Sequence, residues 1–127
     1  MSLASFALIL TGVLLNAAAQ LLLKAGANRV GPVEIQLHAL TGAARDLAFS
    51  APIVAGIACY AVSVMVWVIA LTRVEVSLAY PMLSIGYVVN AIAAWMLFGE
   101  QLTPLRMIGI LVIILGVYLL AASGRAA

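Results

Sequence analysis

Four long apolar segments occupy most of this 127-residue chain, over residues 3–23, 52–71, 76–98 and 104–122, and none contains an acidic residue. An α-helix rises about 1.5 Å per residue, so about 20 residues cross the roughly 30 Å hydrocarbon core of a bilayer. Lipid offers no hydrogen-bond partner for backbone N–H and C=O groups, so such segments must be helical. The sequence therefore predicts an all-α membrane protein with four transmembrane helices, forming a single domain over residues 1–127.

The composition excludes several other classes of protein. Charged residues make up 8% of the chain, against about 25% in a typical soluble domain. The net charge of +2 is small and the basic residues are scattered, so we expect no nucleic-acid partner. Cys59 is the only cysteine, and no spacing of ligand residues indicates a metal site or another cofactor. No pair of carboxylates or Ser/His/Asp set lies in the spans, so we expect a protein that is not an enzyme.

The one long connection covers residues 25–49. Gly26, Gly31 and Pro32 predict an irregular first part. Further on, an apolar face over residues 33–47 can be drawn through Leu37, Leu40, Ala44 and Leu47. This face predicts a short amphipathic helix at the membrane interface, between the first and second spans.

The ends of the spans carry helix-start and topology signals. Ser50 before Pro52, and Thr103 before Pro104, each combine an N-cap residue with a proline in the first turn. The first span is expected to be retained, since residues 1–5 lack the positive charge of a signal peptide. Connections on one side carry four basic residues, and the other side carries two, namely Arg73 and Arg125. The positive-inside rule places both termini outside a bacterial inner membrane, although a partner-dictated orientation remains open.

The first span carries a stripe of polar residues. Asn16, Gln20 and Lys24 are four residues apart and so lie within about 80° of one another on a helix. We interpret this stripe as a groove that binds a polar, anionic head group, with Lys24 contacting its phosphate. The alternative is that the two amides join helices by hydrogen bonds, while Lys24 extends to the membrane surface.

A second polar face lies on the third span. Tyr80, Ser84 and Tyr87 are spaced i, i+4 and i+7, and Asn90 extends the same face. These four side chains join the stripe on the first span as candidate substrate-binding residues.

The same span contains two residues that weaken a helix. Pro81 removes a backbone hydrogen bond and Gly86 weakens the next turn, which predicts a kink between them. In a small transporter such a kink can act as a hinge. The alternative is that Pro81 only helps to start the helix.

The fourth span contains two glycines on one face. Gly109 and Gly116 are seven residues apart, so they allow another helix to approach closely. We interpret this face as a dimer interface, with packing inside one chain as the alternative.

Two stretches of the sequence resemble a known family. Residues 16–24 read NAAAQLLLK, residues 76–84 read VSLAYPMLS, and residues 98–104 read FGEQLTP. Together with four helices in so short a chain, these stretches resemble the small multidrug resistance branch of the drug/metabolite transporter superfamily, the EamA-like group. Within that branch the resemblance is strongest to the small subunits proposed to flip aminoarabinose-phosphoundecaprenol.

The chain also departs from that family in two places. Its multidrug exporters carry a glutamate in the first helix, which binds protons and cationic drugs in turn, where this chain has Asn16. They carry a tryptophan where this chain has Leu83. An amide cannot titrate, so proton-coupled drug export is disfavoured. The resemblance further implies a dimer, either of two copies or with a paralogous small subunit.

We therefore expect a translocase that moves a polyprenyl-phosphate-linked sugar, such as aminoarabinose-phosphoundecaprenol, across the inner membrane. Two alternatives stay open. One is an exporter of small metabolites or drugs. The other is an accessory subunit that transports nothing and stabilises a larger membrane protein.

Overall fold

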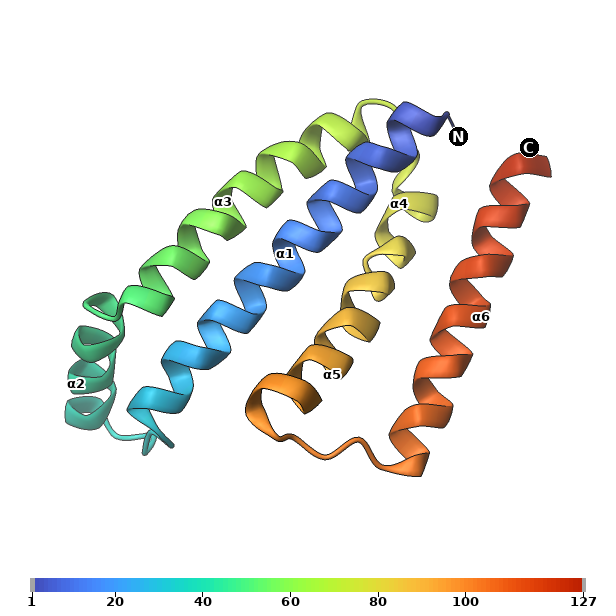
Figure 1. Cartoon of the computed structure of the whole chain (residues 1–127). Coiled ribbons are helices and arrows are strands. Elements are labelled where there is room, and N and C mark those ends of the chain that lie inside the picture. Colours follow the sequence, from blue (N-terminus) through green and yellow to red (C-terminus); the bar gives the residue numbers. More distant parts are fainter. Residues whose placement is uncertain (1, 127) are drawn as a thin grey trace.

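The computed structural model describes the backbone of residues 2–126 and the side chains of residues 2–123, so the side chain of Arg125 lies outside the described residues. Six helices form this part of the chain (Figure 1): α1 Leu3–Val30, α2 Leu37–Ala48, α3 Ala51–Leu71, α4 Val76–Met82, α5 Ser84–Phe98 and α6 Pro104–Ala126. Four helical stretches are long and apolar enough to span a membrane, with α4 and α5 together making the third. The prediction of an all-α protein with four transmembrane helices is confirmed.

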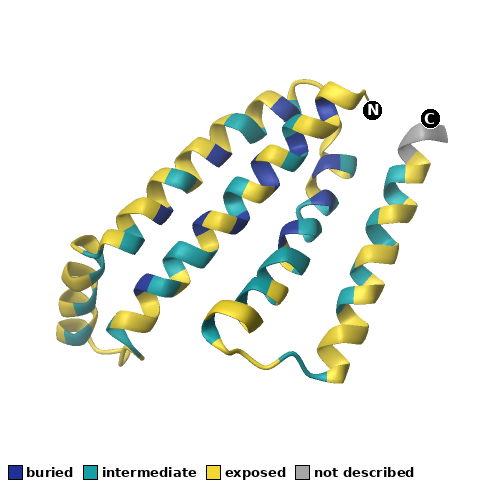
Figure 2. Cartoon of the chain, in the orientation of Figure 1, coloured by how far each residue is buried: buried dark blue, intermediate teal, exposed yellow. Residues whose placement is uncertain are grey.

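The spans lie side by side in the order α3, α1, α4–α5 and α6 (Figure 1). Both ends of the described chain lie at the same end of the spans, at the top in Figure 1, and the two longer connections lie at their opposite end. Among the described elements α6 contacts only α4 and α5. No residue in the membrane-spanning window of α6 is buried (Figure 2), so its outer face is free to meet lipid or another protein.

A seam of small residues joins α1 to α3. Every seventh position on the facing sides is small and buried, namely Ser5, Gly12, Ala19 and Gly26 on α1 and Gly56, Ser63 and Ala70 on α3. A Cβ atom on Gly56 would lie 3.1 Å from the carbonyl oxygen of Ala19, so the two backbones approach closely there. The thiol of Cys59 donates a hydrogen bond to the carbonyl oxygen of Leu15 at 3.3 Å. Lipid supplies no hydrophobic force between helices, so this close packing stabilises the pair.

Helix α1 is longer than predicted. An irregular stretch was expected from Gly26 onward, but it covers only residues 31–36, because α1 continues to Val30. Gly26 belongs to the seam, where an added Cβ atom would overlap the side chain of Ile53. The helix ends at Gly31, whose φ of +80° suits glycine.

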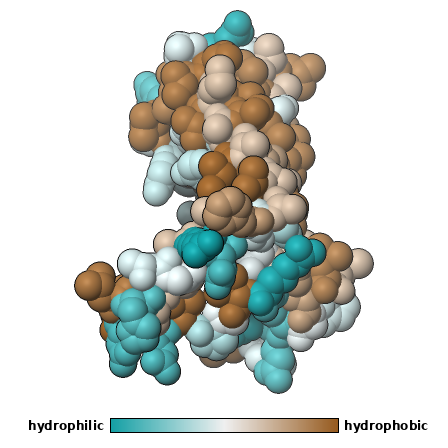
Figure 3. Space-filling view, turned by 90° about the vertical axis from the view of Figure 1, so that its left-hand side faces the viewer, coloured by the Kyte–Doolittle hydropathy of each residue, from teal (hydrophilic) through white to brown (hydrophobic). Residues whose placement is uncertain are grey.

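The connection between α1 and α3 contains the predicted short helix. It spans Leu37–Ala48, begins later than the pattern suggested, and buries no residue. Figure 3 shows that hydrophilic side chains gather toward this end of the molecule, below an apolar surface. This arrangement is consistent with an amphipathic helix at the membrane interface.

The third span is interrupted within the region where a kink was expected. Helix α4 ends at Met82 and α5 begins at Ser84, with Leu83 between them. The N–H groups of Leu83 and Gly86 both reach back only three residues, to the carbonyl oxygens of Tyr80 and Leu83. Proline lacks an N–H group, so Pro81 leaves the Ser77 carbonyl without its helical partner.

The two predicted helix caps differ in the structure. The Thr103 hydroxyl accepts a hydrogen bond from the N–H of Arg106 at 3.2 Å, which confirms that cap. The expectation for Ser50 is wrong in part, because its hydroxyl caps no N–H group and is buried without a partner among the described residues. Pro52 stands at one of the two positions whose N–H a cap normally binds, so a donor is missing there.

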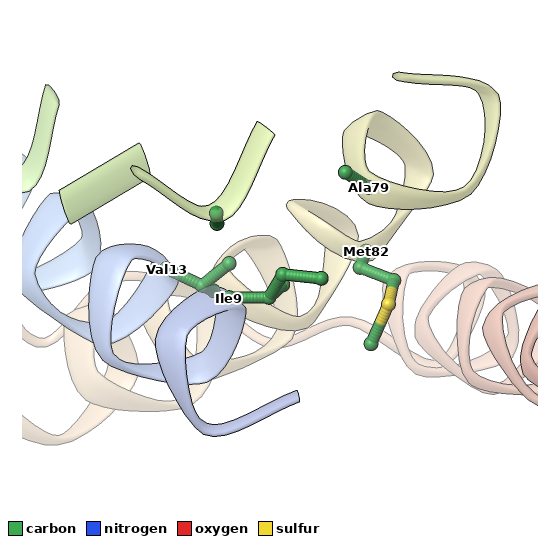
Figure 4. Packing of buried hydrophobic residues seen from close by; sticks show 5 residues of the cluster. Ile9, Val13, Ala79 and Met82 are labelled. Atoms are coloured by element: carbon green, nitrogen blue, oxygen red, sulfur yellow. The ribbon is translucent and has the colours of Figure 1, made fainter. Parts of the chain in front are cut away.

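A small apolar cluster holds α4 against α1 and α3. Figure 4 shows Ile9 and Val13 of α1 beside Ala79 and Met82 of α4. Trp67 of α3 and Leu83 pack against this cluster from the side. The cluster therefore positions the Trp67 ring and the interruption of the third span relative to each other.

Candidate functional site

A cavity of about 190 Å³ opens where α1, α3 and α4 meet. We call it the aromatic cavity, and its walls are Gly12, Asn16, Tyr60, Ser63, Val64, Trp67, Tyr80 and Leu83. Three aromatic rings, one amide and three hydroxyl groups, two of them on tyrosines, surround it, and none of these side chains carries a formal charge. Such a lining can hold a ligand with apolar faces and several polar groups.

The packing of the spans positions these side chains. A Cβ atom on Gly12 would lie 3.7 Å from the Trp67 ring, in ordinary contact, so the seam brings that ring against α1. Ser63 belongs to the seam itself and donates its hydroxyl to the carbonyl oxygen of Tyr60 at 2.7 Å. Leu83, at the interruption of the third span, forms another part of the wall. A movement at this interruption would therefore change the shape of the aromatic cavity.

The structure divides the polar stripe of α1. Asn16 lines the aromatic cavity, and its side-chain oxygen accepts a hydrogen bond from the Gln20 amide at 3.4 Å. Gln20 is exposed and is not part of the cavity wall. The Lys24 ammonium lies 4.0 Å from a carboxylate oxygen of Glu100, near the connection between α5 and α6. Only Asn16 of the three therefore reaches the cavity.

The predicted polar face of the third span is also divided. Tyr80 lines the aromatic cavity, whereas Ser84 and Tyr87 line two separate cavities between α5 and α6. The side-chain oxygen of Asn90 is buried without a hydrogen-bond partner among the described residues. The interruption at Leu83 separates Tyr80 from the other three, which stand on the next helix.

The remaining predicted residues lie outside the aromatic cavity. Pro81 stands in the last turn of α4, and Gly86 of α5 packs against Val13 of α1. Cβ atoms built on Gly109 and Gly116 of α6 would meet no described atom within 4 Å. These two positions therefore leave room for another molecule.

Tyr60 and Ser63 were not among the site residues predicted from the sequence. Both belong to α3, and together with Trp67 they follow an i, i+3, i+7 spacing that places them on one helix face. That spacing was readable in the sequence, but most of the face consists of residues that also occur in lipid-facing positions. Only the seam with α1 shows that it points inward.

The comparisons with known proteins agree with the family resemblance. The profile of the EamA-like transporter family matches residues 3–122. No solved structure matches the chain at a significant level.

Three curated relatives carry related names. A protein of Pseudomonas fluorescens Pf-5, named "Probable 4-amino-4-deoxy-L-arabinose-phosphoundecaprenol flippase subunit ArnF", is 38% identical over 114 residues, covering 88% of this chain and 83% of the relative. The protein of the same name in Aeromonas hydrophila is 33% identical over 120 residues, covering 93% and 80%. A subunit named ArnE in Salmonella paratyphi B is 34% identical over 65 residues, covering 51% and 59%.

Proposed function

The chain belongs to the EamA-like transporter family, and from this membership we propose that it is a translocase of a polyprenyl-phosphate-linked amino sugar in the bacterial inner membrane. Its relatives in Pseudomonas and Aeromonas are named as flippase subunits for 4-amino-4-deoxy-L-arabinose-phosphoundecaprenol. On this account the chain carries the sugar head group through the membrane and catalyses no chemical reaction.

The lining of the aromatic cavity is the observation that carries this proposal. A sugar ring presents apolar C–H faces together with hydroxyl groups, and the cavity offers aromatic rings beside the Asn16 amide and the Ser63 hydroxyl. The amino group of the named sugar is a cation at neutral pH. Aromatic faces attract cations, and no Asp or Glu is present in any of the four spans. Tyr60, Trp67 and Tyr80 therefore suit a cationic amino sugar.

The other candidate residues have supporting roles in this proposal. Gln20 orients Asn16 through their hydrogen bond, and Lys24 meets the phosphate as it leaves water. Ser84, Tyr87 and Asn90 contact the lipid as it passes α5. Without an acidic residue in the spans, transport runs down the gradient of the lipid itself.

Movement is proposed to occur at the interruption of the third span. Pro81 and Gly86 flank Leu83, which is part of the cavity wall. Rotation of α4 against α5 at this hinge would open the aromatic cavity to one leaflet and close it to the other.

A single chain leaves one side of the row of helices open. The apolar surface of α6 is exposed, and Gly109 and Gly116 leave space beside it. We therefore include a dimer in the proposal, formed with a second copy or with a paralogous small subunit, as the paired names of the relatives suggest.

A flipping assay in liposomes tests the proposed function. The purified chain, alone and with its paralogue, is reconstituted into liposomes with the lipid-linked amino sugar. The amino group is then labelled with a membrane-impermeant reagent that reacts with amines. We expect the protein to expose the inner-leaflet amino sugar to the reagent, while Asn16→Ala protein does so about tenfold more slowly. Equal labelling with and without protein would contradict the proposal.

The liposome assay, together with isolation of the protein from cells, distinguishes the proposed function from the exporter and from the accessory subunit. An exporter of small metabolites would release a trapped drug or metabolite in the absence of any lipid carrier. An accessory subunit would show no flipping and would be recovered from cells together with a larger membrane protein.

A further inference from the structure

Of the two cavities between α5 and α6, the one that Tyr87 lines lies at the end of the molecule that also carries α2. Its volume is about 340 Å³. Small and aliphatic side chains form most of its walls, namely Ala91, Ala94, Leu102, Gly109, Ile110 and Ile113, with Tyr87 beside them. We call it the α5–α6 cavity. The whole cavity runs along α6 from Arg106 to Ile113, which at about 1.5 Å per residue is roughly 10 Å.

The other end of the α5–α6 cavity is polar. Glu100, Gln101 and Arg106 complete its wall there. The guanidinium of Arg106 donates a hydrogen bond to the carbonyl oxygen of Gln101, which fixes the charge at this end. Lys24 reaches the same end, with its ammonium 4.0 Å from Glu100. The three ionic groups Lys24, Glu100 and Arg106 sum to one positive charge.

This arrangement is complementary to a lipid with a single long chain and an anionic head. Resting on the proposed function, we infer that the α5–α6 cavity binds the polyprenyl phosphate part of the lipid. The phosphate lies beside Arg106, and the first isoprene units lie against Gly109, Ile110 and Ile113. A guanidinium can hold a phosphate by two parallel hydrogen bonds, so Arg106 is the principal contact.

The charge at the polar end decides between a lipid and a helix of another chain as the occupant. The four spans contain no Asp or Glu, so a span of a second copy seated along α6 would offer Arg106 no anionic side chain. A phosphate neutralises the excess charge. The start of α6, capped by Thr103, lies at the same end and adds the positive end of its dipole.

Two substitutions on α6 test the site. Added side chains at Gly109 and Gly116 would each enter open space, but only Gly109 lines the α5–α6 cavity. Gly109→Leu should therefore fill the cavity without disturbing the fold, and Gly116→Leu is its matched control. Undecaprenyl phosphate is added to the full-length protein in detergent, and bound lipid is counted by native mass spectrometry. We expect Gly109→Leu to weaken lipid binding per chain about tenfold and Gly116→Leu to leave lipid binding per chain unchanged, whatever either variant does to the proposed dimer.

A third variant and two other lipids test the role of the phosphate. Arg106→Gln should weaken binding of undecaprenyl phosphate about tenfold and leave binding of uncharged undecaprenol unchanged. Phosphatidylglycerol, which has an anionic phosphate and two acyl chains, should compete poorly. Equal loss in both glycine variants would assign the face to a protein–protein contact and overturn the inference. Equal binding of phosphatidylglycerol would overturn the polyprenyl lipid as the occupant.

The lipid-binding inference and the proposed function can be tested separately, and either can fail without the other. Asn16 lies in the aromatic cavity, so Asn16→Ala should not alter binding of undecaprenyl phosphate, which has no sugar. If the α5–α6 cavity binds this lipid but no amino sugar is flipped, the inference stands and the proposed function fails. If flipping occurs and Gly109→Leu binds the lipid as the unaltered protein does, the proposed function stands and the inference fails.

Discussion

The ammonium of Lys24 on α1 lies 4.0 Å from a carboxylate oxygen of Glu100, which follows α5 by two residues. This ion pair joins α1 to the connection between α5 and α6. Both side chains are about half exposed, at 50% and 43%. An ion pair this exposed contributes roughly 0–1 kcal/mol, so an anionic ligand can replace Glu100 as the partner of Lys24 at little cost.

Removing that carboxylate should favour an anionic lipid. In Glu100→Gln, Lys24 loses its partner and the α5–α6 cavity loses its only negative group. We expect undecaprenyl phosphate to bind about two- to fivefold more tightly, the range that corresponds to a pair contributing up to about 1 kcal/mol. Native mass spectrometry at several lipid concentrations measures the change. Arg73→Gln, in the turn between α3 and α4, is the control and should have no effect. Weaker lipid binding by Glu100→Gln would contradict this role.

The two amides of α1 should differ in importance. Asn16 lines the aromatic cavity. Gln20 lies outside this cavity and only donates a hydrogen bond to the Asn16 side chain, at 3.4 Å. Loss of one hydrogen-bonding group costs about 1–1.5 kcal/mol, so Asn16→Ala should slow flipping about tenfold. Gln20→Ala should slow it about two- to threefold. The liposome assay compares both, and equal rates for the two variants would show that the cavity does not hold the head group.

The aromatic rings should select the amino group of the sugar. Cation–π attraction contributes about 0.5–2 kcal/mol, so Trp67→Leu should reduce the preference for the amino sugar over a neutral sugar on the same lipid about two- to thirtyfold. Trp95 is exposed on α5 and lines none of the three cavities described above, so Trp95→Leu is the matched control. Competition between the two lipids in the flipping assay measures the preference. An unchanged preference in Trp67→Leu would remove the aromatic cavity as the amino-group site.

The proline of α4 should affect transport and stability in opposite directions. Pro81→Ala restores an N–H donor for the Ser77 carbonyl and favours a continuous helix, and proline inside a helix costs about 3 kcal/mol. We expect a higher melting temperature and slower flipping. Faster flipping in this variant would argue against a hinge at Leu83.

The small-residue seam should tolerate little enlargement. In Gly56→Ala the new methyl group would lie 3.1 Å from the Ala19 carbonyl oxygen, a backbone atom that cannot turn away. Overpacking of this kind costs about 1–3 kcal/mol, so the melting temperature in detergent should fall by several degrees. Gly42→Ala is the control, because no described atom lies within 4 Å of the added methyl group. An equal change in both variants would show that the seam does not hold α1 and α3 together.

Sequence patterns were sufficient to predict the spans, because lipid imposes one length and one kind of secondary structure on them. The interruption of the third span was equally accessible, since Pro81 acts through its own backbone. The extent of α1 could not be predicted in this way, because a glycine such as Gly26 is compatible with two opposite structures. Isolated in a sequence it suggests an irregular segment, but against Ile53 it permits close helix packing.

The site was harder to predict than the fold. Periodicity groups residues on one helix face, and it placed Tyr80, Ser84 and Tyr87 together as though the third span were continuous. The break at Leu83 separates Tyr80 from the other two, and the three side chains line three different cavities. The contribution of α3 depends on which of its apolar faces meets α1, and that follows from a seam of small residues that carries no chemical signal of its own.

The most direct test of the account is native mass spectrometry of the protein released gently from its own membranes, with the retained lipid identified by fragmentation. The account predicts a retained phosphoprenyl lipid, and predicts that a smaller share of this lipid carries the amino sugar in Asn16→Ala than in the unaltered chain or the Trp95→Leu control. A protein that retains only bulk phospholipid, in both the unaltered chain and the variants, would contradict it.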